Sequence, residues 1–511
     1  MPDSNRNLRR TKYIFVSGGV ISGIGKGITS ASISLLLKAA GYKIAPIKFE
    51  NYLNLDAGTI NPIEHGDTFL CEDGTEADMD IGTYEKFLGE DMGKDNFIGG
   101  TAGEYQNVFY YEASRIMTLK NPGDVIHVHV SYVPTPKHLG EPKTKPTQLS
   151  VRTLNSLGIQ PDFIICRSEK YLDQRRRDRL ALFCNVPSEN VISSPDLPSV
   201  YEVPLILDKQ SLGKKILRKL NLKVKDSNLS KWQRFVGKVK KVQNQNEFVE
   251  IAIVGKYFGT GDYQLRDSYA ALFDAIDHAS YELGVHVKTH WINAEKAEEN
   301  PDLEKLIGKP DGIIVPIGWG SRGAEGMIKT AGYARQKKIP YLGLCYGMQL
   351  AVISYARDVL ELKDANTEEN DPSGKNLVIH LMPKQKEFMQ RRAYGGTMRL
   401  GRWEATVKKG TRAFKLYDRY NDFIDKSKCL TSERHRHRYE FNNDYAEKFE
   451  KSGFIVAAKS VEEGLAEIIE LSESKHPFYL GTQGHPEYKS RPLNPHPIFL
   501  GFIESVFKNR N

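Results

Sequence analysis

Residues 339–347 read IPYLGLCYG, a short apolar run that leads into a cysteine with a glycine two positions away on either side. The pattern predicts a strand up to Leu344, a sharp turn at Cys345 and a helix beginning near Met348. The glycines let neighbouring backbones approach the turn, and the N-terminus of the following helix favours a thiolate. Cys345 is therefore a candidate nucleophile; the alternative interpretation is a buried structural cysteine.

A second motif supplies what a thiol nucleophile needs. Residues 483–487 read QGHPE, which places His485 two residues before Glu487. An imidazole can act as the base and a nearby carboxylate can orient it. The chain order Cys345, His485, Glu487 fits a hydrolase-like triad.

Alternating strand and helix patterns run through both halves of the chain and predict an α/β fold with two doubly wound domains. In the first half we expect strands at 12–17, 43–49, 125–130 and 163–166, and helices at 28–40 and 149–157. In the second half we expect strands at 249–254, 285–291, 312–315 and up to 344, and helices at 265–283 and 324–335.

The length of 511 residues exceeds what one hydrophobic core usually supports, so two domains are expected. Between residues 222 and 247 the chain becomes polar and charged, with an amphipathic helix around 232–239. We therefore predict an N-terminal domain over 1–225, a linker over 226–248 and a C-terminal domain over 249–511.

Composition narrows the class of protein. The net charge is +8, with 72 basic residues interspersed among 64 acidic ones, so we expect no nucleic-acid partner. The basic runs at 175–177 and 231–241 are interpreted as solvated surface. Five dispersed cysteines without a CxxC pair, and no apolar run long enough for a signal or membrane segment, predict a cytoplasmic protein with no membrane contact.

A glycine-rich loop follows the first predicted strand. Residues 22–27 read SGIGKG, so backbone N–H groups and the Lys26 ammonium can converge on a phosphate chain. Gly27 stands where a Walker A motif has Ser or Thr, so carboxylates elsewhere must hold a metal ion. Lys48, on the next predicted strand, can reach the same ligand.

Eight ordered motifs give the chain a resemblance to the CTP synthase family, whose C-terminal half is a class I glutamine amidotransferase. They are SGGVISGIGKGI (17–28), KFENYLNLDAGTINPIEHG (48–66), DGTEADMDIG (73–82), GEPKTKPTQ (140–148), LGLCYGMQ (342–349), GGTMRLG (395–401), ERHRHRYE (433–440) and HPEY (485–488). The resemblance implies a ligase of pyrimidine nucleotide synthesis that aminates UTP to CTP with ATP and with ammonia from glutamine.

The resemblance also assigns roles to residues. Cys345 attacks the glutamine amide, His485 transfers the proton and Glu487 orients His485, and ammonia passes internally to the other domain. It assigns glutamine to Gly318, Gln349, Glu369 and Arg438; ATP to Gly23, Ile24, Gly25, Lys26, Gly27, Lys48 and Asp80; and UTP to Ser22, Lys143, Lys145, Gln148 and Arg179. Asp80 would also bind Mg2+, GTP would be an effector, and the chain would form a homo-oligomer, dimer or tetramer.

Some of these residues also have an alternative interpretation in which they bind no ligand. Arg438 and its neighbours could form a structural polar loop, and an Asp such as Asp80 is usually just solvated. The HxH spacing of His435 and His437 suggests zinc, but no Cys or carboxylate pattern completes a zinc shell.

The chain departs from the family pattern at three places. Phe97 stands where the family has a magnesium-binding acid, and a segment of several elements is missing between Phe97 and Ile98. Glu50-Asn51 replaces Asp-Pro, and Ile317 replaces a glycine whose N–H helps form the oxyanion hole, where a branched residue resists positive φ. Two alternatives therefore stay open: an impaired paralogue acting as a nucleotide-binding regulatory or filament subunit, or a glutaminase alone.

Overall fold

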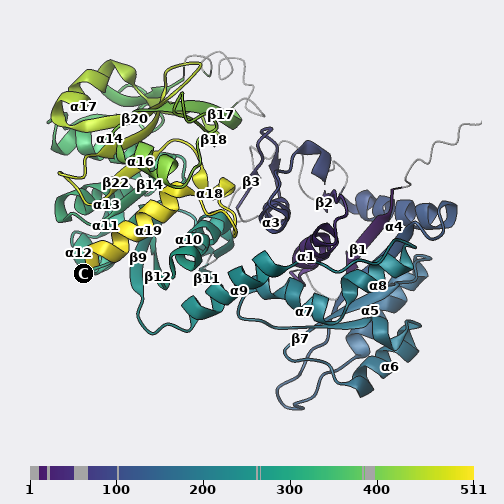
Figure 1. The fold of residues 1–511 in the computed structure, drawn as a ribbon. Helices are drawn as coiled ribbons and strands as arrows, with labels where there is room; N and C mark the ends of the chain where they lie inside the picture. The colour runs from purple at the N-terminus through teal and green to yellow at the C-terminus, as the bar shows by residue number, and fades with distance from the viewer. Residues whose placement is uncertain are drawn as a thin grey trace, which may run out of the picture. The chain divides into compact units, whose positions relative to one another are not determined.

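The computed structural model describes residues 11–19, 23–50, 67–99, 103–260, 263–264, 266–382, 385 and 398–510 (Figure 1). The chain forms two compact units. Unit 1 comprises Met1–Tyr52, Thr83–Glu90 and Asn96–Val236, and unit 2 comprises Leu53–Gly82, Asp91–Asp95 and Gly237–Asn511. The units thus divide within helix α9 (Ser230–Gln243), and a short part of the N-terminal half packs with unit 2.

Unit 1 is built on a parallel sheet of the order β1 (Tyr13–Gly18), β6 (Val125–Tyr132), β7 (Phe163–Ser168) and β8 (Val191–Pro195). Alternate residues of β7 enter different cores. Phe163 and Ile165 pack with helices α1 (Lys26–Ala39), α7 (Val203–Lys209) and α8 (Leu212–Lys219). Ile164 and Cys166 pack with α5 (Lys145–Ser156) and α6 (Gln174–Cys184). Helices therefore cover both faces, which confirms the predicted doubly wound architecture.

The strand expected at 43–49 is mostly wrong, because only β2 (Lys48–Glu50) is extended and paired. It pairs in parallel with β5 (Phe97–Gly99), with Lys48 opposite Phe97, in a separate two-stranded sheet. Within the described part of the chain, β1 is consequently an edge strand of the four-stranded sheet. The residues just before Phe97, Lys94–Asn96, form a 3-10 turn.

Unit 2 contains a sheet of nine strands in the order β12-β9-β13-β14-β22-β21-β20-β17-β18. The first five are parallel: β12 (Val287–Asn293), β9 (Val249–Gly255), β13 (Gly312–Val315), β14 (Tyr341–Leu344) and β22 (Tyr479–Thr482). The others are antiparallel: β21 (Ala466–Leu471), β20 (Phe454–Ser460), β17 (Arg399–Val407) and β18 (Leu430–His437).

The two faces of this sheet are also both covered (Figure 1). Ile251 and Ile253 of β9 pack with α10 (Ala270–Leu283) and α19 (Pro497–Arg510). Ala252 and Val254 pack with α13 (Ala324–Lys337) and α14 (Tyr346–Asp358). The alternation of one strand thus supplies two cores, as a buried parallel strand requires.

The described residues also form other helices and strands. They are β3 (Phe69–Leu70), β4 (Glu76–Ala77), α3 (Met79–Leu88), α4 (Gly103–Lys120), β10 (Gly259–Thr260), β11 (Tyr263–Gln264), α11 (Ala294–Glu299), α12 (Leu303–Ile307), β15 (Ala365–Thr367), β16 (Asn376–Leu381), α16 (Arg412–Arg419), β19 (Tyr439–Phe441), α17 (Ala446–Ser452) and α18 (Pro486–Lys489). Among the described residues, no helix combines the length and apolarity needed to cross a membrane.

Candidate active site

Cys345 lies at a strained turn between β14 and α14. Its backbone has φ 50° and ψ −99°, outside the conformations that side-chain-bearing residues usually adopt. A Cβ added at Gly347 would lie 1.9 Å from the Val315 carbonyl oxygen, and one at Gly343 would lie 2.8 Å from the Gly347 backbone. Only glycine fits at these positions, which confirms the predicted tight packing around the turn.

His485 and Glu487 form a buried pair at the end of β22. His485 Nδ1 lies 2.7 Å from Glu487 Oε1, and both side chains are buried. Burial by itself lowers the pKa of His485, but the Glu487 carboxylate and the Cys345 thiol together raise it to about 10. Because Nδ1 faces the carboxylate, Nε2 is left to exchange a proton with the thiol.

The sheet order brings the cysteine and the histidine together. β14 and β22 are adjacent, and the Cys345 backbone N–H donates to the Thr482 carbonyl at 2.7 Å. Gln483 Nε2 lies 3.4 Å from Cys345 Sγ, and the Arg436 carbonyl oxygen lies 3.9 Å from the same sulfur. The thiol is therefore enclosed by the ends of β18 and β22.

The loop at 316–320 is held by four side chains. Trp319 N–H donates to Tyr257 Oη at 3.2 Å, Gly320 N–H donates to Glu369 Oε1 at 2.8 Å, and Tyr346 Oη–H donates to the Gly320 carbonyl at 2.8 Å. Lys256 Nζ donates to the Gly320 carbonyl at 2.6 Å. These bonds fix the backbone of the loop, and they already occupy the N–H groups of Trp319 and Gly320.

Ile317 does not distort this loop as its replacement of glycine suggested. Its backbone is outside the left-handed region, so its branched side chain meets no positive-φ strain. The side chain is buried in a core with Tyr257 and Tyr269, and Tyr269 Oη–H donates to the Ile317 carbonyl at 3.3 Å. The backbone conformation that would penalise isoleucine is not used here.

Two of the residues that are predicted to bind glutamine, Gly318 and Glu369, lie at this loop. Gly318 lies against Lys256 and Tyr346, where an added Cβ would be 2.8 Å from Lys256 Cδ. Glu369 is hydrogen-bonded to Gly320, and burial raises its pKa while Lys256 lowers it. An acid in this position can accept from a substrate ammonium.

The other two residues that are predicted to bind glutamine, Gln349 and Arg438, are hydrogen-bonded to other residues of unit 2. Gln349 Nε2 donates to the Tyr439 carbonyl at 2.9 Å and to Gln483 Oε1 at 3.1 Å. Arg438 Nη1 donates to Gln385 Oε1 at 2.6 Å. Gln349 therefore shares a partner, Gln483, with the thiol.

In unit 1 the glycine-rich loop has the backbone expected of a phosphate loop. Gly23 and Gly25 have φ values of 72° and 92°, and Gly25 caps α1, which begins at Lys26. The Lys26 side chain passes over Gly18, where an added Cβ would lie 2.6 Å from Lys26 Cδ. Ile24 and Gly27 are buried beneath the loop, and Ser22 lies outside the described residues.

The remaining residues that are predicted to bind ATP or UTP lie on separate elements of the chain. Lys48 is on β2 and Asp80 is in the first turn of α3. Lys145 and Gln148 are on α5, and Lys143 just before it pairs with Glu141. Arg179 is exposed on α6, which contacts the 141–143 loop through a 3.2 Å bond from Arg176 Nε to the Pro142 carbonyl.

Comparison with known proteins places these two sites in one family. The family described as "CTP synthase N-terminus" matches residues 12–98 and 96–222, and "Glutamine amidotransferase class-I" matches residues 264–505. A CTP synthase of Pyrococcus abyssi is 44% identical over 549 aligned positions, covering 97% of this chain and 98% of the relative. The chain belongs to the CTP synthase family.

Other CTP synthases are similar to the same extent. That of Caldanaerobacter subterraneus is 41% identical, again over 97% of this chain and 98% of the relative. A solved structure described as "Trypanosoma brucei CTPS - glutaminase domain with bound acivicin" is 33% identical, covers 51% of this chain and 94% of that chain, and has a TM-score of 0.44.

The match to the CTP synthase family is interrupted near Phe97. The N-terminal family match breaks into two pieces that meet at residues 96–98. The alignment with the P. abyssi CTP synthase has 549 positions, 38 more than the 511 residues of the whole chain. Relatives therefore carry residues for which this chain has no counterpart, and the break in the match coincides with the departure predicted from sequence.

The described residues do not assemble a metal site around Asp80. No group of three or more His, Cys, Asp or Glu side chains in the described ranges is arranged to hold a metal ion. Phe97, where the resemblance predicted an acid, is buried and apolar. His435 and His437, to which the zinc interpretation referred, belong to no such group within the described ranges.

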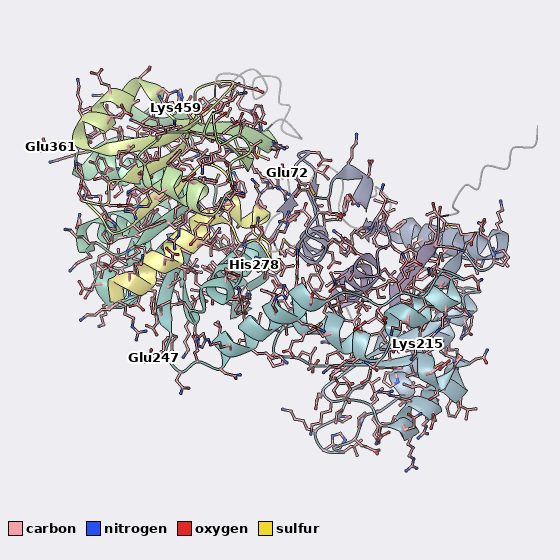
Figure 2. The ribbon with its side chains drawn as sticks, viewed as in Figure 1. Glu72, Lys215, Glu247, His278, Glu361 and Lys459 are labelled. Atoms are coloured by element: carbon pink, nitrogen blue, oxygen red, sulfur yellow. The ribbon has the colours of Figure 1, made fainter. Side chains whose placement is uncertain are left out.

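Sequence reasoning missed the ion pairs that join β18 to Glu72, Glu76 and Asp91, which lie in the same compact unit. Fully buried Arg434 donates to Glu72 at 2.9 Å, and its Nη2 lies 3.2 Å from Asp91 Oδ1. Arg436 pairs with Glu76, and Glu72 is labelled in Figure 2. The HRHR alternation was an available signal, since successive residues of a strand face opposite ways.

Proposed function

We propose that this chain is a working CTP synthase that hydrolyses glutamine at Cys345 and uses the ammonia to aminate UTP. The observation that carries the proposal is the strained turn that holds Cys345 next to the His485–Glu487 pair. A glutamine amide bound at the 316–320 loop would be attacked by the thiolate, with backbone N–H groups receiving the oxyanion.

Proton transfer in the first half-reaction falls to His485. As imidazolium, its Nε2 would protonate the leaving amine, so that ammonia departs and a thioester remains on Cys345. Water would then attack the thioester while His485 accepts its proton, which releases glutamate and restores the thiolate. Gly318, Gln349, Glu369 and Arg438 are proposed to orient glutamine.

The second half-reaction is assigned to unit 1. ATP would bind at Gly23, Ile24, Gly25, Lys26 and Gly27, with Lys48 nearby, and would phosphorylate O4 of a UTP held by Ser22, Lys143, Lys145, Gln148 and Arg179. Ammonia would then displace phosphate. Lys26 and Lys48 would neutralise charge that grows during phosphoryl transfer.

Further properties are proposed from family membership alone. We expect Mg2+ to accompany the nucleotide phosphates, with Asp80 as its one predicted carboxylate ligand, and we assign no step to the ion. We also expect GTP as an effector, assembly into a homo-oligomer and a cytoplasmic location.

The break at residues 96–98 favours a second candidate, a family member that releases ammonia but completes UTP amination poorly. Phe97 cannot replace a carboxylate, and a lost ligand weakens nucleotide–metal binding. Such a chain could act as a nucleotide-binding regulatory or filament subunit, or as a glutaminase.

The test separates the half-reactions. The purified chain is incubated with UTP, ATP and MgCl2, and either glutamine or ammonium chloride, while CTP and glutamate are measured. We expect CTP from both nitrogen sources, and from ammonium alone after Cys345→Ala. Glutamate without CTP would select the second candidate. A folded wild-type chain that forms no glutamate would contradict the glutaminase assignment.

A further inference from the structure

The two histidines of the ERHRHRYE motif lie in a buried cluster with Arg399 and Glu467, here called the Arg399 cluster. Arg399 Nη1 lies 3.2 Å from His435 Nδ1 and 3.3 Å from His437 Nε2. Arg399 Nη2 donates to Glu467 Oε1 at 2.7 Å. All four side chains are nearly inaccessible to solvent.

The partners in the Arg399 cluster define where each proton lies. His437 Nδ1 is 2.9 Å from the Tyr439 carbonyl oxygen, so it carries a hydrogen and Nε2 accepts from Arg399. His435 Nδ1 also lies 3.2 Å from His437 Nε2; because a guanidinium has only donors, both nitrogens accept from Arg399 and neither donates to the other. The His435 proton is then on Nε2, which lies 3.4 Å from Glu467 Oε2.

The Arg399 cluster lies directly behind the turn that carries the catalytic base. The Glu467 carbonyl accepts from Gln483 N–H at 2.8 Å, and the Arg434 carbonyl accepts from His485 N–H at 2.8 Å. A Cβ added at Gly484 would lie 3.3 Å from His435 Nε2. The Glu433 and His435 side chains therefore both lie against Gly484, with an added Cβ 2.6 Å from Glu433 Cβ.

Charge in the Arg399 cluster matters to His485. Burial first, and then the Arg399 charge, hold the pKa values of His435 and His437 well below the usual range. His485 acts on both histidines in the same direction, so a cation on either would oppose an imidazolium at His485. Glu467 balances Arg399, and Glu440 and Glu433 also act on Glu467.

We propose that Arg399 and Glu467 are positioning residues for glutamine hydrolysis, which hold the 483–485 turn against the Cys345 thiol through two neutral histidines. The inference rests on the proposed glutaminase function. Neither residue touches the reacting atoms. Their effect is on the geometry of His485 and Gln483 and on the charge that His485 can carry.

The test replaces Arg399 with methionine, which keeps an unbranched side chain about as long as the aliphatic stem of arginine and removes the guanidinium with every donor. We expect kcat for glutamate formation to fall about tenfold or more, because small misplacement of a catalytic group is costly, with KM for glutamine within about threefold. Arg399→Lys keeps the charge but lacks the fork, so it should recover folding stability more than kcat.

A second readout does not require turnover. Iodoacetamide alkylation of Cys345, followed by mass spectrometry of its peptide, reports the nucleophilic reactivity of the Cys345 sulfur. We expect the rate at pH 7 to fall about tenfold in Arg399→Met. Cys345→Ala gives the background.

Arg357→Met is the matched control. Arg357 is a half-buried arginine at the far end of α14, which makes a bidentate pair with Glu325. It should lower the melting temperature without changing kcat or alkylation. Arg399→Met with wild-type kcat and alkylation would overturn the inference, as would losses no larger than those of Arg357→Met at equal stability. A wild type that forms no glutamate, yet whose alkylation depends on Arg399, would instead refute the proposed function alone.

Discussion

Among single residues, the proposed glutamine hydrolysis depends most on the protonation state of His485. Its Nδ1 is 2.7 Å from Glu487, and the buried carboxylate opposes the effect of burial on the imidazole. A neutral amide in place of Glu487 would keep the shape and remove the charge. The role of the carboxylate can therefore be tested without changing the packing.

We predict that Glu487→Gln lowers kcat for glutamate formation by about 10²- to 10⁴-fold, because the imidazolium loses its counter-charge and its orienting group. A coupled glutamate assay measures this. Glu473→Gln, in an exposed pair with Lys415, is the control and should keep the wild-type rate. An unchanged rate in Glu487→Gln would exclude Glu487 from the triad.

The same pair predicts how stability depends on pH. The pKa of His485 is raised from 6.5 to about 10, so its stabilisation is complete below pH 6.5 and is lost as pH rises towards 10. The difference in unfolding free energy between wild type and Glu487→Gln should therefore be larger at pH 6 than at pH 9.5. Denaturant titrations at both pH values measure it, and a difference that grows with pH would contradict the assignment.

Among the elements, the turn from β14 to α14 depends most on backbone packing. Gly347 lies against the Val315 carbonyl of β13, and Gly343 lies against Gly347. β18 is the other decisive element, because its arginines pair with Glu72 and Glu76 while its histidines support the 483–485 turn. One strand thus links the N-terminal segment to the base.

We predict that Gly347→Ala destabilises the protein by about 3 kcal/mol or more, because a Cβ cannot share space with a backbone oxygen 1.9 Å away. Urea unfolding measures the change. Gly237→Ala is the matched control: no atom lies within 4 Å of its added Cβ, and in α9 it should stabilise by about 1 kcal/mol. Equal effects of the two substitutions would refute the packing argument.

For the molecule as a whole, the main difference from its relatives is that they carry residues for which this chain has no counterpart. The family match breaks at residues 96–98, where β5 pairs with β2 in a small sheet of its own. In the described part of the chain the main sheet of unit 1 ends at β1. Among the described residues, the edge at β1 is therefore open to an additional strand.

We predict that grafting the corresponding segment of a CTP synthase relative between Phe97 and Ile98 raises ammonium-dependent CTP formation about tenfold or more, because a carboxylate metal ligand returns. Glutamate formation should stay within about twofold. An insertion of equal length made of Gly and Ser is the control. Equal CTP rates in the graft and the control would show that the segment is dispensable.

Much of the fold was predictable because strand and helix periods are local. β13 was expected at 312–315 and observed there, and β9, β14 and α13 were expected within a few residues of their bounds. The strand expected at 43–49 was wrong over its first five residues, since a strand needs a paired neighbour and periodicity cannot supply one. The backbone conformation of Ile317 could not be predicted from the sequence either, because its φ depends on packing with Tyr257 and Tyr269.

The α/β class, the CTP synthase resemblance and the candidates Cys345, His485 and Glu487 could all be read from the sequence, because each follows from residues close together in the chain. The structure was needed to find that β14 and β22 are neighbours, that Glu72 and Glu76 pair with Arg434 and Arg436, and that Arg399 and Glu467 lie in one buried cluster with His435 and His437. Those contacts join residues far apart in sequence, and their geometry comes from sheet order and burial.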